Sequence, residues 1–331
     1  MTIRTIRSSR SSGAPPRAVF FGSPAFAVPF LEAVAQVTNV VAVVSQPDRP
    51  AGRGKQLTEP AVKVAARRLN VPILQPEKVR TPDFEAALRG LDADLFIVVA
   101  YGRILPQTLL DVPRRGCWNV HGSLLPKLRG AAPIQWAIIR GERTTGVAVM
   151  RMEAGLDTGP VAAVREVPIG QDDTTATLAR ALAAVGAPLL VDTLPAILDG
   201  RVRLAPQDDA AATLAPPLVK DDGRLRFDVP AREVSARARG CDPWPGATAL
   251  LDGAPVRLFG PRVLPGPAGG AAGAVIGARP EGLAVACADA PIAFAELQLP
   301  GRRRLPAAAL LAGRPIAPGT SLQDPAAHPR S

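Results

Sequence analysis

The residues best suited to chemistry gather in one stretch of the chain, between residues 116 and 159. Asn119 and His121 stand two residues apart in the apolar segment Cys-Trp-Asn-Val-His, which the sequence predicts to be a strand. Side chains alternate along a strand, so both polar groups should emerge on the same face. Asp157 follows a second apolar segment, in the turn Gly-Leu-Asp-Thr-Gly, and is predicted to face the same crevice.

These three side-chain types suit acyl transfer to a neutral amine. An imidazole can carry or donate a proton near neutral pH, an amide can donate to a developing oxyanion, and a carboxylate can hold the imidazole in its charged form. The alternative is that His121 is a hydrogen-bonded core histidine and Asp157 merely forms a turn. Gly122 ends the predicted strand directly after His121, and open α/β sheets bind ligands at that end, which favours a site.

The elements that must position these residues alternate from Arg17 to Leu198. The predicted strands are residues 18–22, 40–46, 71–75, 94–100, 117–121, 146–152 and 161–169. The predicted helices are residues 24–36, 60–70, 81–91, 133–141 and 174–198. This order predicts an α/β fold with a Rossmann-like, doubly wound and mostly parallel sheet that helices cover on both faces.

The rest of the chain divides around that sheet. Residues 1–16 are rich in Arg and Ser, lack acidic residues and are predicted to be a flexible arm. The catalytic domain is expected at 17–200, a polar linker rich in Pro and Ala at 201–217, a smaller domain at 218–320 and a tail at 321–331. Short strands separated by Gly and Pro turns predict a small β-barrel for the smaller domain. Trp244, with a proline on each side, is expected in its core.

Composition limits the class of protein. The 331 residues suffice for two domains with their own cores, and 47% hydrophobic with 21% charged residues is typical of a globular protein. No apolar run approaches the ~20 residues that span a bilayer, so a soluble protein without a membrane partner is expected. The three cysteines lie far apart without a CxxC pair, which argues against a disulfide scaffold or a zinc site, and no metal is expected.

The chain carries a formal net charge of +10, and its positive charges are clustered. The clusters are Arg49, Arg53, Lys55, Lys63, Arg67 and Arg68; Arg114, Arg115, Lys127 and Arg129; and Arg302, Arg303 and Arg304. Such clustering is typical of proteins that bind nucleic acids. From composition alone, a solvated basic face remains an equal alternative.

Four segments together resemble the methionyl-tRNA formyltransferase family. They are NVHGSLLPKLRGAAPIQWAI at residues 119–138, QPDRPAGRGK at 46–55, VVAYGRILP at 98–106 and DPWPGA at 242–247. The first, with GLDTG, is shared by the wider group of 10-formyltetrahydrofolate transferases and hydrolases, and QPDRPAGRGK narrows the resemblance to the tRNA enzymes. The resemblance implies formyl transfer from 10-formyltetrahydrofolate to methionyl-initiator tRNA for translation initiation. It also implies that the smaller domain is an OB-like barrel that binds tRNA.

The resemblance also implies roles for individual residues. Asn119 and protonated His121 would stabilise the oxyanion, and Asp157 would sustain the imidazolium and relay the amine proton. The implied folate contacts are Ser123, Leu124, Leu125, Pro126, Ala100, Tyr101, Gly102 and Ile104. The implied tRNA contacts are Arg49, Arg53 and Lys55. The expected partners are initiator methionyl-tRNA and tetrahydrofolate, and the expected protein is a cytoplasmic monomer.

Other interpretations remain open at this point. The same three catalytic residues would serve a folate-dependent formyltransferase that acts on a UDP-amino-sugar, on glycinamide ribonucleotide or on another small amine, or a formyltetrahydrofolate hydrolase. The segment at residues 46–55, the basic excess and the second domain count against the glycinamide ribonucleotide enzyme, and the segment at residues 46–55 counts against the sugar enzyme. A non-catalytic RNA-binding protein would leave the Asn-Val-His and Gly-Leu-Asp-Thr-Gly motifs unexplained.

Overall fold

A computed structural model describes residues 14–51 and 56–325. The contacts within the chain group it into two compact units. The first unit comprises Met1–His121, Val149–Ala163 and Ala183–Gln207, and the second comprises Gly122–Ala148, Val164–Leu182 and Asp208–Ser331. The domain boundaries expected from the sequence stay a prediction.

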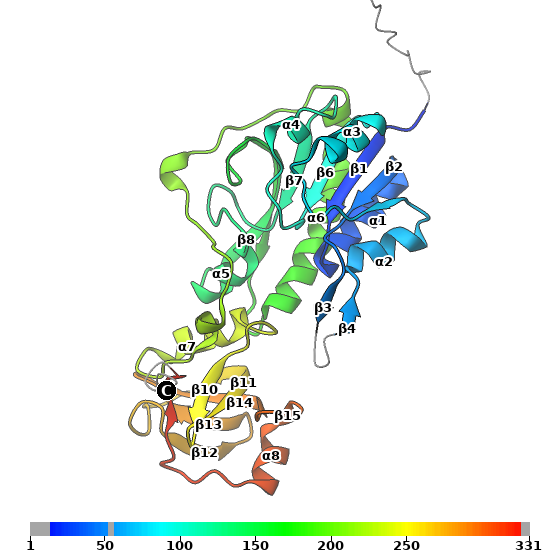
Figure 1. Cartoon of the computed structure of the whole chain (residues 1–331). Helices are drawn as coiled ribbons and strands as arrows, with labels where there is room; N and C mark the ends of the chain where they lie inside the picture. The colour runs from blue at the N-terminus through cyan, green and yellow to red at the C-terminus, as the bar shows by residue number, and fades with distance from the viewer. Residues whose placement is uncertain (1–13, 52–55, 326–331) are drawn as a thin grey trace, which may run out of the picture. The chain divides into compact units, whose positions relative to one another are not determined.

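The first large sheet has the strand order β5-β2-β1-β6-β7-β8-β9. Its strands are β1 (Arg17–Gly22), β2 (Asn39–Val44), β5 (Ile73–Leu74), β6 (Leu95–Val99), β7 (Cys117–His121), β8 (Thr144–Arg151) and β9 (Val161–Pro168). The pairs β1–β2, β1–β6, β2–β5 and β6–β7 are all parallel. Every residue of β6 is buried, as expected of a strand covered on both faces. The predicted doubly wound, mostly parallel sheet is confirmed (Figure 1).

The helices around this sheet follow the predicted periodicity closely. They are α1 (Val28–Val37), α2 (Ala61–Arg68), α3 (Pro82–Gly90), α4 (Gln107–Leu110), α5 (Pro133–Ile139) and α6 (Thr175–Leu198), with a 3-10 turn, η1 (Ala25–Ala27), before α1. Thr81 caps α3 by accepting a hydrogen bond from the backbone N–H of Phe84, and Phe84 and Leu88 bury the inner face of that helix. Two features were not predicted: the short α4, and a hairpin of β3 (Arg49–Ala51) and β4 (Gln56–Thr58).

The sequence was expected to contain no apolar segment long enough to span a bilayer, but helix α6 is such a segment. Its length and apolar composition are those of a possible membrane span, although only 44% of its most apolar window is buried in the protein. The long core helix of a soluble protein passes the same test, and Leu178, Leu182, Leu190 and Leu194 of α6 are fully or almost fully buried. The helix is therefore weak evidence for a membrane and compatible with a soluble core.

The C-terminal part of the second unit is built on an antiparallel sheet with the order β12-β13-β14-β11-β10-β16, in which β15 pairs with β14. Its elements are α7 (Ala231–Gly240), β10 (Thr248–Leu251), β11 (Ala254–Val263), β12 (Val275–Arg279), β13 (Gly282–Ala286), β14 (Pro291–Gln298), β15 (Leu305–Pro306), α8 (Ala307–Gly313) and β16 (Leu322–Gln323). Gly282 has a φ of +131°, and a Cβ there would lie 2.0 Å from the carbonyl oxygen of Phe294. The predicted smaller domain of short strands is confirmed, the antiparallel order of its strands is a finding of the structure, and its closure as an OB-like barrel stays a prediction.

The expectation for Trp244 is wrong, because its side chain is 53% exposed. The backbone beside it fills the interior instead. A Cβ at Gly223 would lie 2.3 Å from the carbonyl oxygen of Gly246 and 3.1 Å from Cγ of Pro245. The neighbouring turn therefore packs through its proline and glycine, which leaves the indole outside.

Candidate active site

Strand β7 carries Asn119 and His121 on one face, as its alternation predicts. The intervening Val120 is buried with its side chain on the opposite face. The register pairs Val98 of β6 with Asn119, so the polar face begins beside the carboxyl end of β6. His121 is the last residue of β7 and is only 5% exposed, a burial that a polar side chain tolerates when it has partners.

The structure brings Asp157 to both of these side chains. Its Oδ1 accepts a hydrogen bond of 3.2 Å from Nδ2 of Asn119, and its Oδ2 lies 3.6 Å from Nδ1 of His121. The second distance is too long for a direct hydrogen bond, so the carboxylate acts on the ring through its charge. Because the side chain of Asp157 is only 14% exposed, water screens that charge weakly. One carboxylate thus orients the amide and faces the imidazole.

The loop after β8 places Asp157 through its backbone. Asp157 has a φ of +53°, in the left-handed region that aspartate tolerates better than most residues. Position 159 accommodates only glycine without a shift of the backbone, since a Cβ there would lie 1.9 Å from the carbonyl oxygen of Arg151. The backbone N–H of Met152 donates to the carbonyl of Cys117 over 2.8 Å, which holds the start of the loop beside β7.

A residue that the sequence did not single out holds the other end of this loop. Nε2 of Gln207 donates to the carbonyl oxygens of Asp157 and Gly159, over 2.8 and 2.6 Å. Gln207 belongs to the segment expected to be a polar linker, where one glutamine among Pro, Ala and Asp gives no signal of such a contact.

Of the residues expected to contact folate, four follow β6 in the first unit. Ala100 and Gly102 have positive φ values of +48° and +81° and are exposed, and Ile104 is 66% exposed. Tyr101 differs, because its ring lies in the core, edge-on to Phe21 at 5.5 Å, and burial raises the pKa of its phenol. Tyr101 therefore presents its backbone, whose carbonyl accepts a hydrogen bond of 3.1 Å from Nε2 of Gln46.

The other four, Ser123–Pro126, form a turn in the second unit. Ser123 is fully buried, and its hydroxyl donates to the carbonyl of Lys127 over 2.6 Å, which closes the turn. Leu124 packs against Gly146, where a Cβ would lie 2.4 Å from its Cδ2. Leu125 and Pro126 are half-buried. The structure therefore gives this turn a fixed shape of its own.

Of the residues expected to contact tRNA, Arg49 is exposed on β3, whereas Arg53 and Lys55 lie outside the described residues. The base of this hairpin is anchored by polar contacts. Nε2 of Gln75 donates to the carbonyl of Gln46 and to Oδ1 of Asp48, over 2.9 and 2.7 Å, and Nζ of Lys63 lies 2.6 Å from Oδ2 of Asp48. The hydrogen bond from Gln75, followed by that from Lys63, holds the pKa of the Asp48 carboxyl below its ordinary value.

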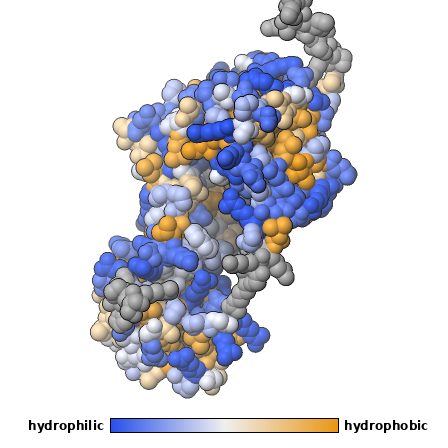
Figure 2. Space-filling view, viewed as in Figure 1, coloured by the Kyte–Doolittle hydropathy of each residue, from blue (hydrophilic) through white to orange (hydrophobic). Residues whose placement is uncertain are grey.

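Many cations of the basic clusters pair with nearby carboxylates. These pairs are Arg67 with Glu59, Arg68 with Glu32, Arg114 with Asp92, Arg129 with Asp209, and Arg304 with Glu296. Arg304 also lies 3.9 Å above the ring of Phe259. On the face shown in Figure 2, hydrophilic residues predominate and apolar residues form small separate patches. Counting cations in the sequence therefore overstates the unpaired positive charge.

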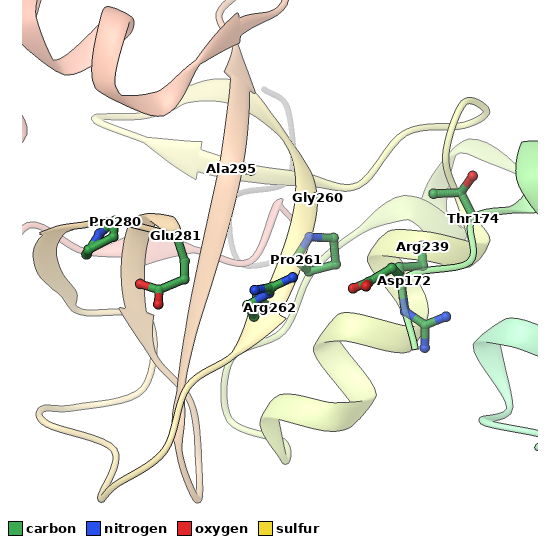
Figure 3. A pocket seen from close by; sticks show the side chains of 9 residues that line it. All are labelled: Asp172, Thr174, Arg239, Gly260, Pro261, Arg262, Pro280, Glu281 and Ala295. Atoms are coloured by element: carbon green, nitrogen blue, oxygen red, sulfur yellow. The ribbon is translucent and has the colours of Figure 1, made fainter. Parts of the chain in front are cut away.

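The second unit contains a pocket away from these residues. A pocket of about 380 Å³ in the second unit is lined by Asp172, Thr174, Arg239, Gly260, Pro261, Arg262, Pro280, Glu281 and Ala295 (Figure 3). It contains none of the predicted site residues and carries charges of both signs. Within residues 14–51 and 56–325, no group of three or more His, Cys, Asp or Glu side chains is arranged to hold a metal ion.

Known protein families match this chain in the region of the Asn-Val-His motif of β7 and the Gly-Leu-Asp-Thr-Gly motif after β8. The family described as Formyl transferase matches residues 17–194, and the one described as Formyl transferase, C-terminal domain, matches residues 217–315. The chain belongs to the formyl transferase family.

Its curated relatives identify a particular member of that family. The methionyl-tRNA formyltransferase of Sorangium cellulosum is 49% identical over 92% of this chain and 99% of its own length. That of Myxococcus xanthus is 48% identical over 92% of this chain and 97% of its own length.

Solved structures share the fold at low sequence identity. HypX from Aquifex aeolicus in complex with tetrahydrofolic acid is 18% identical, with a TM-score of 0.61 over 90% of this chain and 47% of HypX. The sugar 3N-formyl transferase WlaRD is 15% identical, with a TM-score of 0.63 over 88% of this chain and all of WlaRD. At these identities, the likeness concerns the fold alone.

Proposed function

We propose that this protein transfers the formyl group of 10-formyltetrahydrofolate to the α-amino group of methionyl-initiator tRNA, giving the formylated aminoacyl-tRNA that starts translation. The observation that carries the chemistry is the Asp157 carboxylate between the amide of Asn119 and the imidazole of His121. The acceptor is supported by the methionyl-tRNA formyltransferases that match 92% of the chain at 48% and 49% identity.

In the proposed reaction, the methionyl amine attacks the formyl carbon, and a C–N bond forms as the carbonyl oxygen becomes an oxyanion. Protonated His121 and the remaining N–H of the Asn119 amide stabilise that oxyanion. Asp157 sustains the imidazolium and relays the proton that the amine loses. The bond between the formyl carbon and N10 then breaks, and N10 receives the proton.

The two substrates would meet this site from different elements. The loop of Ala100, Tyr101, Gly102 and Ile104 and the turn Ser123–Pro126 would hold the folate. Exposed apolar side chains such as Ile104 suit a flat pterin ring, and backbone polar groups suit its edge. Arg49, Arg53 and Lys55 would contact the tRNA, since arginine forks match phosphate groups. We propose a cytoplasmic monomer that needs no metal.

An assay with two acceptors tests the acceptor directly. The full-length protein is given 10-formyltetrahydrofolate with either methionyl-initiator tRNA or a UDP-amino-sugar, and the formylated product is measured. Formylation of the tRNA at a kcat/KM at least about 100-fold higher than that of the sugar is expected, because a site built for one acceptor discriminates strongly against another. A preference for the sugar would overturn the tRNA assignment while leaving the formyl-transfer chemistry in place.

A further inference from the structure

Gln207 lies behind the loop that carries Asp157 and contacts it twice. Its side-chain amide donates one hydrogen bond to the carbonyl of Asp157 and one to the carbonyl of Gly159. An amide nitrogen has two hydrogens, so both are used on the two carbonyls that flank Thr158. The contact therefore fixes two successive bends of the loop rather than a single point.

The backbone that carries Gln207 is itself held in place. Two residues earlier, Ala205 forms an isolated antiparallel bridge with Val161, with N–H to O distances of 2.9 Å in both directions. Val161 begins β9, so the bridge ties the segment to the edge of the sheet. Gln207 is also half-buried, which restricts the side chain to few conformations.

The loop needs such support because its backbone is unusual. Asp157 adopts a positive φ, a backbone conformation that costs a residue other than glycine free energy and persists only where neighbouring residues hold it. Rotation about the Asp157 backbone would swing the carboxylate away from Asn119 and His121, to which it lies 3.2 and 3.6 Å. A displacement of about 1 Å at a catalytic group can cost up to 100-fold in rate.

We propose that Gln207 is a positioning residue, which holds the loop of Asp157 so that its carboxylate faces Asn119 and His121. The two hydrogen bonds from its Nε2 go to backbone carbonyls of the loop, so Gln207 acts on the loop through its backbone. It lies between the two matched family segments, which end at residue 194 and begin at 217. The inference rests on the proposed function, since Asp157 matters to catalysis only if formyl transfer occurs at this site.

The test uses Gln207→Met, which keeps the length of the side chain but donates nothing, and Gln207→Glu, which places a carboxylate against two carbonyl oxygens. Asp208→Ala is the matched control, because the exposed Asp208 side chain accepts a hydrogen bond from the backbone N–H of its neighbour Ala210 in the same turn. Each full-length variant is compared with the wild type in formylation of methionyl-tRNA, in thermal unfolding and in amide hydrogen exchange of residues 153–159.

We expect both Gln207 variants to lower kcat about 10-fold or more, with KM for both substrates within about twofold, since Gln207 is not among the residues proposed to bind folate or tRNA. Amide hydrogen exchange of residues 153–159 should accelerate, more in Gln207→Glu than in Gln207→Met, while Asp208→Ala resembles the wild type in all three measurements. A kcat within about twofold of that of Asp208→Ala, unchanged exchange, or a loss that follows a lowered Tm would each overturn the positioning role.

The two proposals fail in different ways. If the wild type does not formylate methionyl-tRNA, the proposed function is wrong, and the exchange comparison, which needs no substrate, still decides whether Gln207 holds the loop. If the wild type is active and Asp157→Ala is not, but the Gln207 variants turn over normally, the proposed function stands and the inference about Gln207 is wrong.

Discussion

The strand-end site and the charged segment at residues 46–68 place polar groups in opposite ways. At the strand end, the side chains of His121 and Asp157 are 5% and 14% exposed. The Asp157 carboxylate accepts a hydrogen bond from Asn119, and Gln207 holds the backbone of its loop. In the charged segment, Arg67 is 56% exposed and pairs with the partly exposed Glu59. Buried polar groups must satisfy one another, whereas exposed charges have water as an alternative partner.

This difference decides what each region can contribute to function. The buried side chains at the strand end are held in one arrangement, so the chemistry they can perform follows from their geometry. The exposed cations can pair with a carboxylate of the chain or with a phosphate of a partner, and pairing inside the chain reduces what is left for the partner. Arg67 is an exposed cation that pairs within the chain, with Glu59.

Loss of the buried charges should have the largest effect. His121→Ala or Asp157→Ala should lower kcat about 100-fold or more, because each removes a group that stabilises charge as the oxyanion forms. Single-turnover formylation of methionyl-tRNA measures the chemical step, and circular dichroism checks the fold. A correctly folded variant with an unchanged rate would remove that residue from the mechanism and would break the contrast between the two regions.

Gly159→Ala should have the next largest effect, because the buried site depends on the backbone beneath it. The added Cβ would lie 1.9 Å from the carbonyl oxygen of Arg151, so the loop must shift. We expect a destabilisation of about 1–3 kcal/mol, measured by urea unfolding, together with a lower kcat. Gly90→Ala is the control, since a Cβ there meets nothing within 4 Å. Equal behaviour of the two variants would show that the loop is not tightly fixed.

Much of the first unit could be predicted because its signals are local. The proximity of Asn119 and His121 follows from strand alternation, and that of Asp157 from its place after the next strand of the sheet. Gln207 could not be found, because a contact across 50 residues leaves no periodic trace in the sequence. Nor could the exposure of Trp244, which depends on how Pro245 and Gly246 pack against Gly223.

Arg53 and Arg67, which pairs with Glu59, should differ in their effect on tRNA binding. Arg53→Ala, at a residue outside the described part of the chain, should raise KM for methionyl-tRNA and reduce the salt slope of binding by about one unit, as loss of one phosphate contact would. Arg67→Ala changes the net charge equally but removes a cation already paired with Glu59. Its salt slope should stay near that of the wild type.

Kinetics at two salt concentrations, beside the dissociation constant of folate, separate the possible results. Folate binding should hardly change in either variant. Equal salt slopes for Arg53→Ala and Arg67→Ala would mean that local pairing does not decide which cations meet the tRNA. A defect confined to folate would contradict the tRNA assignment of the hairpin.

The smallest effect should come from the ion pair at the base of the hairpin. Hydrogen bonds from Gln75 and then from Lys63 lower the pKa of the Asp48 carboxyl from its ordinary value of 3.8. A carboxyl whose pKa is lower in the folded chain than in the unfolded chain stabilises the fold when the pH is above its unfolded-state pKa. This stabilisation is lost as the pH falls through its folded-state pKa. The hydrogen bond that Lys63 donates to Asp48 raises the pKa of the Lys63 ammonium above its ordinary value of 10.5, so the contribution of Lys63 to stability is lost only as the pH rises through that higher pKa. Asp48→Asn keeps an acceptor for Gln75 and removes the charge, so it should lower Tm at pH 7 by roughly 1–2 °C. The difference from the wild type should shrink as the pH falls below 3.8 and through the lowered pKa of Asp48, and a Tm difference that stays as large across this acid range as at pH 7 would show that Asp48 acts through packing rather than through charge.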